Sequence, residues 1–170
     1  MLPPAESRDT ESDETDPVIG ILRQAKQLAC QYYELTGKPL GVTGEIAEFE
    51  AARLLGLTLH VARTAGYDAT EIRNGQPYKI QIKGRCITNT NARHAGRMGS
   101  INLNQEFDSV MLVLLDHEFN AFAIYEATRG LCEELIHAEG SVARNVRGSL
   151  AISQFKSRGT LRWVREEPRK

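Results

Sequence analysis

The sequence predicts an α/β domain in which helices flank a central mixed sheet. Residues 110–115 form a continuous apolar run, typical of a strand buried on both faces. Asn74-Gly75 lies between two extended segments and is a strong hairpin signal. Residues 18–35 carry apolar side chains at helical spacing. We expect the sheet to include five segments, with helix 44–55 packed against it: 57–62, 69–73, 78–83, 109–115 and 121–125.

Length and composition are those of an ordinary globular domain. The chain has 170 residues, of which 41% are hydrophobic and 25% charged. No apolar run approaches the roughly 20 residues that span a bilayer, and the N-terminus lacks the pattern of a signal peptide. Three widely separated cysteines, Cys30, Cys86 and Cys132, indicate neither a disulfide framework nor a zinc site. These features predict a cytoplasmic protein without a membrane partner.

Charge divides the chain into two parts. Residues 1–17 hold six acidic residues, one basic residue and three prolines, which predicts a disordered acidic segment. We expect residues 18–170 to form a single domain, with 20 Lys and Arg against 16 Asp and Glu. This basic excess is compatible with a nucleic-acid partner. The sequence leaves open whether the chain works alone or as a homodimer.

The remaining elements are predicted from local signals. Thr43 is a suitable N-cap for helix 44–55, and Gly56 suits its end. The polar stretch 88–100 has no hydrophobic period and predicts a long loop. The other expected elements are a helix at 128–137, a loop at 141–148, a short helix at 149–155 and a strand at 161–164.

The predicted hairpin consists of strands 69–73 and 78–83 joined by a turn at 74–77. Side chains alternate along a strand, so Gln81 and Lys83 project from the same face. The fold-back also brings the residue before the first strand close to the end of the second.

Asp68 therefore lies beside Gln81 and Lys83 in the predicted hairpin. A carboxylate, an amide oxygen and an ammonium group converge there. Oxygen ligands suit a hard cation such as Mg²⁺, and a nearby lysine can orient water or neutralise a phosphate oxygen. The alternative is a surface hairpin whose polar residues simply face solvent.

Two acids on helix 44–55 are further candidates. Glu45 and Glu48 are three residues apart and share one side of the helix. The helix is apolar over most of its circumference and should be largely buried, so an acid on it needs a reason. Glu50 and Arg53 are expected on a solvated face.

In these residues and in element order, the sequence resembles the PD-(D/E)XK nuclease superfamily. The resemblance covers about residues 43–125 and the following helix. It implies a restriction-endonuclease-like α-β-β-β-α-β core, to which residues 18–35 add an extra N-terminal helix. In that family an aspartate begins the second core strand, an acid-x-lysine motif ends the third, and a first-helix glutamate often completes a metal site.

The residues in the matching places are Asp68, Gln81 with Lys83, and Glu48 or Glu45. Gly44-x-x-x-Glu48 is similar to the first-helix motif of archaeal Holliday-junction resolvases, which favours Glu48. Gln81 stands where most members carry an acid, although Mrr-like restriction endonucleases are similar in having Q-x-K. The amide oxygen can still bind a metal, but the site has one negative charge fewer.

The resemblance implies an endonuclease that hydrolyses phosphodiester bonds with Mg²⁺ or Mn²⁺, with DNA as the favoured substrate and restriction, repair or defence as its setting. Asp68, Gln81, the Ile82 carbonyl and a helix glutamate would hold the metal, and Lys83 would position the nucleophile or stabilise negative charge. Six arginines are candidates for contacts with the nucleic-acid backbone: Arg63, Arg85, Arg93, Arg97, Arg144 and Arg147.

Two other classes of function remain open. One is a catalytically silent nucleic-acid-binding module that keeps the nuclease fold, an alternative that Gln81 raises. The other is a structural or regulatory subunit whose acidic N-terminus binds a partner. The sequence does not distinguish DNA from RNA, or recognition of a sequence from recognition of a structure.

Overall fold

The computed structural model describes residues 17–37, 40–60, 66–87, 96–140 and 142–166. Its centre is a six-stranded sheet in the order β1-β2-β3-β4-β5-β6, in which β3 and β4 are parallel and all other neighbours are antiparallel. The strands are β1 (Thr58–Leu59), β2 (Ala69–Arg73), β3 (Gln76–Cys86), β4 (Ser109–Leu115), β5 (Ala121–Thr128) and β6 (Thr160–Val164). The predicted α/β class with a mixed sheet is confirmed.

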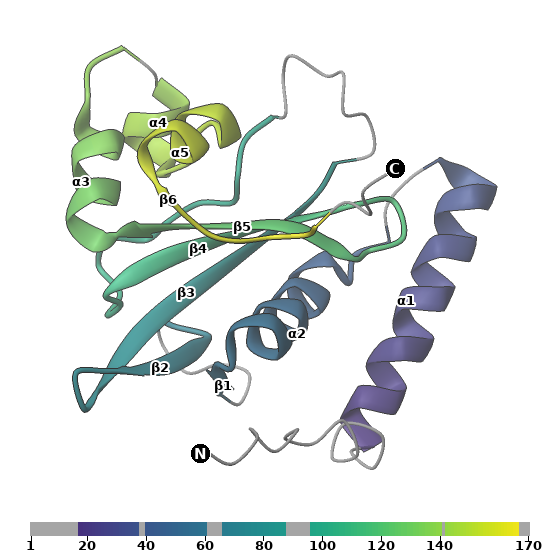
Figure 1. The fold of residues 1–170 in the computed structure, drawn as a ribbon. Helices are drawn as coiled ribbons and strands as arrows, with labels where there is room; N and C mark the ends of the chain where they lie inside the picture. Colours follow the sequence, from purple (N-terminus) through teal and green to yellow (C-terminus); the bar gives the residue numbers. More distant parts are fainter. Residues whose placement is uncertain (1–16, 38–39, 61–65, 88–95, 141, 167–170) are drawn as a thin grey trace.

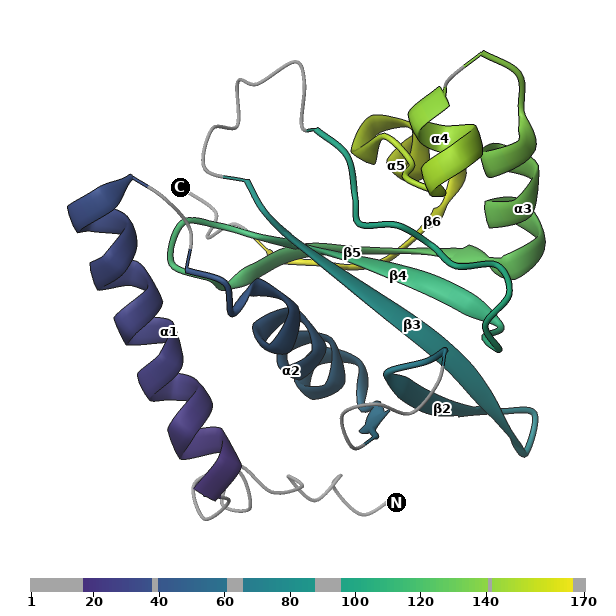
Figure 2. The same ribbon diagram turned by 180° about the vertical axis from the view of Figure 1, so that it is seen from behind.

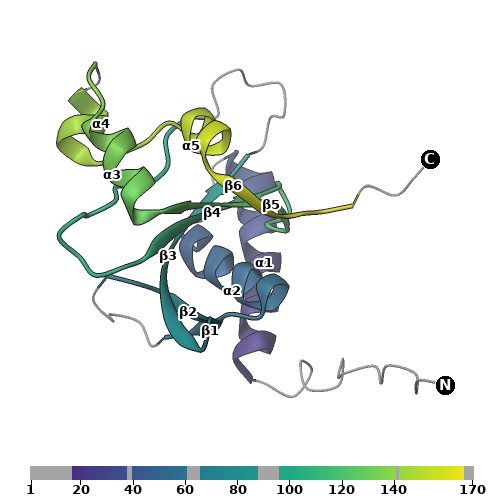
Figure 3. The same ribbon diagram turned by 60° about the vertical axis from the view of Figure 1, so that its left-hand side comes forward.

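Helices cover both faces of the sheet. One face carries α2, and the other carries the three helices of the C-terminal part (Figures 1 and 3). The first helix, α1, is the predicted extra N-terminal helix, and it stands at the rim of the molecule beside α2 (Figures 1 and 2). The helices are α1 (Pro17–Thr36), α2 (Thr43–Leu55), α3 (Arg129–His137), α4 (Val142–Arg147) and α5 (Ile152–Arg158). None of the helices described is long and apolar enough to cross a membrane.

The central strand β4 explains the continuous apolar run in the sequence. All seven of its residues are buried. Met111, Val113 and Leu115 join the cluster that packs under α2. Their neighbours at 110, 112 and 114 join the cluster on the α3 side. A strand that is buried on both faces does not need alternating polar and apolar residues, which explains the run at 110–115.

Strand boundaries differ from the predicted ones where pairing extends them. β3 and β5 flank β4 along its whole length, and both run about three residues further than local propensity indicated. Of the predicted strand 57–62, Thr58 and Leu59 pair with β2, whereas residues 61 and 62 lie outside the described residues. In the described part of the chain, five strands lie between α2 and α3, two more than in the core that the resemblance implied.

Two predictions about the helices were wrong. The predicted loop 141–148 contains α4, because Asn145 Nδ2 donates to Ile136 O at 2.7 Å and ties the segment to the end of α3. Thr43 is not an N-cap but the first residue of α2, and no side chain caps this helix. Gly56 has φ of 67° and ends α2 as predicted. The predicted disordered segment lies outside the described residues except for Pro17, which begins α1, and so does the 88–95 part of the predicted long loop.

Candidate active site

A tight hairpin fixes the register of the candidate site. Asn74 and Gly75 have φ of 51° and 75°, as a two-residue type I′ turn requires. Arg73 pairs with Gln76, so the predicted four-residue turn is too long by two residues. The same register pairs Ala69 with Ile80 and places Asp68 opposite the residue after Ile80.

Beyond this point β3 continues without β2. β2 begins at Ala69, whereas β3 runs on to Cys86 and leaves an edge that no strand covers among the described residues (Figure 2). Asp68 closes the start of this edge, because its Oδ2 accepts a hydrogen bond from the Ile82 backbone N–H at 2.6 Å. The N–H and C=O of one residue point to the same side of a strand. The Ile82 carbonyl oxygen therefore faces the edge on which the Asp68 carboxylate lies.

Gln81, opposite Asp68 in the hairpin register, is buried, and only one of its two side-chain polar atoms has a hydrogen-bond partner among the described residues. Its side chain is 6% exposed, and its Nε2 donates to Gly66 O at 3.3 Å. Its Oε1 is buried and accepts no hydrogen bond from the described residues. A buried polar atom without a partner costs about 1–3 kcal/mol, so this amide oxygen calls for a partner such as a cation.

Gly66, which holds the Gln81 amide, sits where no side chain fits. Its φ is 101°, and a Cβ there would lie 2.5 Å from the Glu106 carbonyl oxygen. The close passage of the two backbones thus fixes the acceptor for Gln81 Nε2 and, through it, the direction of the amide. The sequence signal for this residue was a glycine directly before the hairpin.

Close packing of α2 on β3 brings Glu48 to the site. A Cβ on Gly84 would lie 2.5 Å from Ala47 Cβ and 2.7 Å from Thr43 O, so only glycine permits this approach. Burial, followed by the charges of Asp68 and Glu45, raises the pKa of Glu48 to about 7, while Lys83 lowers it. Glu48 is therefore the acid of α2 that shares an electrostatic environment with Asp68.

The other acids of α2 have different surroundings. Glu45 is exposed in the first turn of the helix. Glu50, which the sequence placed on a solvated face, is 2% exposed. Its Oε2 accepts from the Ala121 backbone N–H at 3.1 Å, and Lys26 and Arg53 pair with it. The prediction for Glu50 was wrong because these partners, apart from Arg53, come from distant parts of the chain.

Lys83 completes the cluster from β3. Burial and the neighbouring Arg85 lower its pKa, whereas Asp68 and Glu48 raise it. Its aliphatic stem passes Gly99, where an added Cβ would lie 3.6 Å from Lys83 Cδ. The structure thus brings together four of the five predicted catalytic residues (Glu48, Asp68, Gln81 and Lys83), with Glu45 at their margin.

The donor set suits a hard divalent cation. Among the described residues, no group of three or more His, Cys, Asp or Glu side chains is arranged to hold a metal. A metal here would instead combine the carboxylates of Asp68 and Glu48 with the amide oxygen of Gln81 and the carbonyl of Ile82. Such a set of oxygen ligands fits Mg²⁺ or Mn²⁺ and would give the unpartnered Gln81 oxygen a partner.

Four of the six predicted arginines lie among the described residues, on β3, near residue 97 and on α4. Arg63 and Arg93 lie outside the described residues. Arg85 donates to Arg97 O and Gly84 O, both at 2.8 Å. The others bind backbone or face solvent: Arg97 donates to Ser149 O, Arg144 to Ala138 O and Glu139 O, and Arg147 is exposed at the end of α4.

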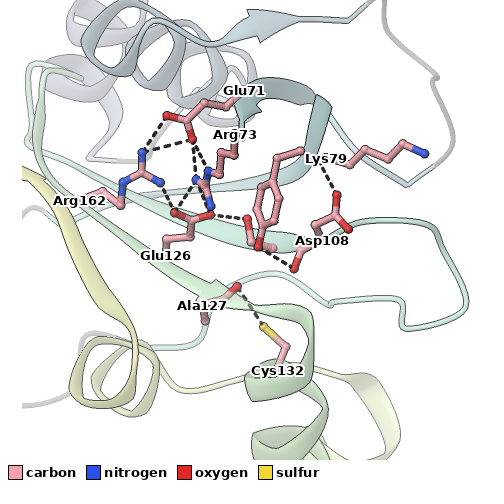
Figure 4. A network of polar contacts seen from close by, with 10 residues as sticks. Glu71, Arg73, Lys79, Asp108, Glu126, Ala127, Cys132 and Arg162 are labelled. Atoms are coloured by element: carbon pink, nitrogen blue, oxygen red, sulfur yellow. Dashed lines mark hydrogen bonds and ion pairs between the residues drawn. The ribbon is translucent and has the colours of Figure 1, made fainter. Parts of the chain in front are cut away.

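An ion network that the sequence did not reveal lies on the α2 face of the sheet. Glu126 is 7% exposed and accepts hydrogen bonds from Arg73, at 2.9 Å, and from Ser109 and Arg162 (Figure 4). Glu71 pairs with both arginines. Burial alone would raise the pKa of Glu126, but the three hydrogen bonds outweigh it and lower the pKa. The network joins four strands and stabilises the sheet.

Comparison of the chain with models of known protein families found no match, and no curated protein matches it. The chemistry of the residues around Asp68 is therefore the basis on which a function can be argued.

Proposed function

We propose that this protein is a metal-dependent endonuclease of the PD-(D/E)XK kind, hydrolysing phosphodiester bonds in DNA. One observation carries the proposal: the Oε1 of Gln81 is buried without a hydrogen-bond partner among the described residues, on the residue that the hairpin register places opposite Asp68. The coupling of Glu48 and Lys83 to Asp68 supports it. Asp68 and Gln81-x-Lys83 match the D-(D/E)XK part of the motif that names such nucleases, with an amide in place of one acid.

Each residue has a separate task in this proposal. Asp68 and Glu48 supply two negative charges, and Gln81 and the Ile82 carbonyl supply neutral oxygens. The hydrogen bond from the Ile82 N–H holds the Asp68 carboxylate in place before any ligand arrives. A bound Mg²⁺ would polarise the scissile phosphate and lower the pKa of a water molecule.

Lys83 contributes a positive charge on the other side of the cluster. Lys83 is half-buried, and its stem passes Gly99. An ammonium in a partly buried site stabilises negative charge on phosphoryl oxygens more strongly than one in bulk water. Burial and Arg85 lower its pKa, which also suits it to pass a proton to the leaving oxygen.

The test is cleavage of plasmid, linear and branched DNA, and of RNA, with Mg²⁺, with Mn²⁺ and with EDTA. We expect metal-dependent cleavage of DNA that Lys83→Ala abolishes. Lys79→Ala is the matched control, because Lys79 lies on the same strand and pairs only with Glu106 and the ring of Tyr67 among the described residues. It should cleave like the parent protein.

Binding of nucleic acid without cleavage of any substrate would favour the catalytically silent module instead. Calorimetry with Mn²⁺ separates the two directly. The proposed enzyme gives a heat of Mn²⁺ binding that Asp68→Ala abolishes, even when its substrate has not been found. A silent module whose site has decayed gives no such heat.

A further inference from the structure

Helix α1 packs along one side on other described residues of the domain. Ala29 is fully buried, Lys26 Nζ donates to Asn120 Oδ1 at 2.7 Å, and Cys30 Sγ lies 3.9 Å from His117 O. These contacts tie the middle of the helix to the turn between β4 and β5, and the ion pair of Lys26 with Glu50 ties it to α2. The helix stands at the rim of the domain (Figures 1 and 2).

A second side of α1 is apolar and exposed. Its residues are Val18 (59% exposed), Ile21 (64%), Ala25 (partly buried), Leu28 (59%), Tyr32 (40%) and Leu35 (86%), which we call the α1 seam. Their spacing alternates between three and four residues, which is the heptad spacing of a coiled coil. At 3.6 residues per turn, the seam lies about 100° around the helix from Ala29 and Lys26. A partner helix can therefore reach it while α1 stays on its own domain.

We propose that the α1 seam binds the α1 seam of a second copy of this chain, antiparallel, and so forms a homodimer. Charge supports a second copy as the occupant. The positions that flank the seam are Leu22 and Ala29 on one side and Gln24 and Gln31 on the other, all uncharged. Two copies of α1 therefore bring no like charges together across their interface.

The ends of the chain are poor alternatives as cover for the seam. Residues 1–16 carry six acids and two prolines, with only Met1, Leu2 and Ala5 as other apolar residues. The last four residues, Glu-Pro-Arg-Lys, contain no large apolar side chain. Neither segment can supply an apolar stripe as long as the α1 seam, whose helix is about 30 Å in length.

Side-chain size favours the antiparallel arrangement. Pairing Val18 with Leu35 of the other copy also pairs Ile21 with Tyr32 and Ala25 with Leu28. Each contact then joins a smaller residue to a larger one, which fills the interface evenly. A parallel pair would instead place Ala25 against Ala25 and Tyr32 against Tyr32, leaving a gap and a crowded layer.

Analytical ultracentrifugation of the full chain from about 1 µM to 1 mM tests the proposal. We expect a monomer–dimer equilibrium in which Leu28→Glu raises the dissociation constant at least about tenfold. Gln27→Glu is the matched control: it adds the same charge at the adjacent exposed position but off the seam, and should leave the constant unchanged. A monomer throughout, or a dimer that Leu28→Glu does not weaken, would overturn the proposal.

Cross-linking tests the orientation in a Cys30→Ser background. Val18→Cys and Leu35→Cys proteins, one of them carrying a size tag, are oxidised separately and as a mixture. The antiparallel dimer gives a cross-link only in the mixture. Cross-linking of each variant with itself would overturn the antiparallel pairing. Neither measurement requires metal or nuclease activity, so the dimer and the proposed function can fail independently.

Discussion

The Asp68 carboxylate binds the Ile82 backbone N–H where the first strand of the hairpin has not yet begun. A side-chain oxygen thus replaces the carbonyl of a missing strand neighbour. The bond keeps the edge of β3 straight and holds the carboxylate beside the Ile82 carbonyl. One contact therefore serves both the hairpin and the candidate metal site, and variants of Asp68 can separate the two roles.

Asp68→Asn should preserve the fold but weaken metal binding. An asparagine oxygen can still accept a hydrogen bond from the Ile82 N–H, so we expect the free energy of unfolding to fall by less than about 1 kcal/mol. The charge is gone, so Mn²⁺ affinity measured by calorimetry should fall at least about tenfold. Asp68→Ala removes both and should also destabilise the hairpin. Unchanged Mn²⁺ binding by a folded Asp68→Asn protein would place the ion elsewhere.

Metal affinity should rise with pH around neutrality because of Glu48. Its pKa is raised to about 7, so below pH 7 the carboxyl is mostly protonated and must lose its proton to bind a cation. We expect Mn²⁺ affinity to increase several-fold between about pH 6 and 8. Glu48→Gln should bind more weakly and lose this pH dependence. Glu45→Gln is the control, and a slope that disappears only with Glu45→Gln would contradict the assignment to Glu48.

The same shift predicts how Glu48 affects stability without metal. Its folded pKa lies above the unfolded value of 4.5, so the folded state binds the extra proton and loses stability as pH rises from 4.5 through 7. Glu48→Gln should therefore stabilise the metal-free protein at pH 8. We expect the free energy of unfolding, measured with urea, to rise by about 1–2 kcal/mol. This is less than the pKa shift alone implies, because Glu48 is partly solvated.

Local signals were enough for the hairpin and the central strand. Asn74-Gly75 fixes a type I′ turn by its own backbone preference, and the turn then sets the register that places Asp68 opposite Gln81. The continuous apolar run of β4 indicates a strand buried on both faces, because apolar and polar residues do not alternate along it. Both features depend on residues close together in the chain, which is why the core of the candidate site could be predicted.

Partners that come from distant segments could not be predicted. Glu50 is buried because Lys26 and the Ala121 N–H meet it, and neither is near it in sequence. The register of β4 with β5 brings Ser109 to Glu126, and Arg162 reaches it from the last strand. Helix periodicity assigns an acid to a face but does not show what covers that face. Backbone carbonyl partners are the hardest to predict from sequence, because every residue carries a carbonyl group.

Gly84→Ala should weaken metal binding from a distance. The added methyl group would lie 2.5 Å from Ala47 Cβ and 2.7 Å from Thr43 O, so α2 must move away from β3 and carry Glu48 with it. We expect a loss of about 1–3 kcal/mol in stability, as for overpacking, and weaker Mn²⁺ binding by the folded fraction. Gly130→Ala in α3 has free space around it and should be neutral or slightly stabilising.

Glu126→Gln should destabilise the protein strongly at neutral pH. It leaves Arg73 and Arg162 partly buried with Glu71 as their remaining acid, and we expect a cost of about 3 kcal/mol in urea unfolding. The pKa of Glu126 is lowered below 4.5, so its contribution is present above that pH and is lost as pH falls below it. Glu133→Gln breaks an exposed pair and should cost about 0.5 kcal/mol or less. Equal effects of the two substitutions would contradict this account.

Gln81→Glu tests whether the unpartnered amide oxygen is a metal ligand. It would place a carboxylate in a pocket where Nε2 now donates to Gly66 O, so the metal-free protein should unfold more easily. With metal present the new charge lies about 4 Å from the cation. A unit-charge pair at that distance is worth about 1 kcal/mol in water and about 4 kcal/mol at an effective dielectric of 20. Even a fraction of this tightens binding several-fold, since about 1.4 kcal/mol is tenfold.

The expected signature of Gln81→Glu is therefore a lower melting temperature in EDTA together with a larger upward shift on adding Mn²⁺. Gln76→Glu, on the exposed start of the same strand, adds the same charge away from the site and should show neither change. Turnover need not increase, because a cation with an additional anionic ligand is a weaker Lewis acid. If Gln81→Glu folds and its Mn²⁺ affinity equals that of the parent protein, Gln81 lies outside the ligands of the metal. Its buried oxygen would then need another explanation, and the proposed function would lose its main support.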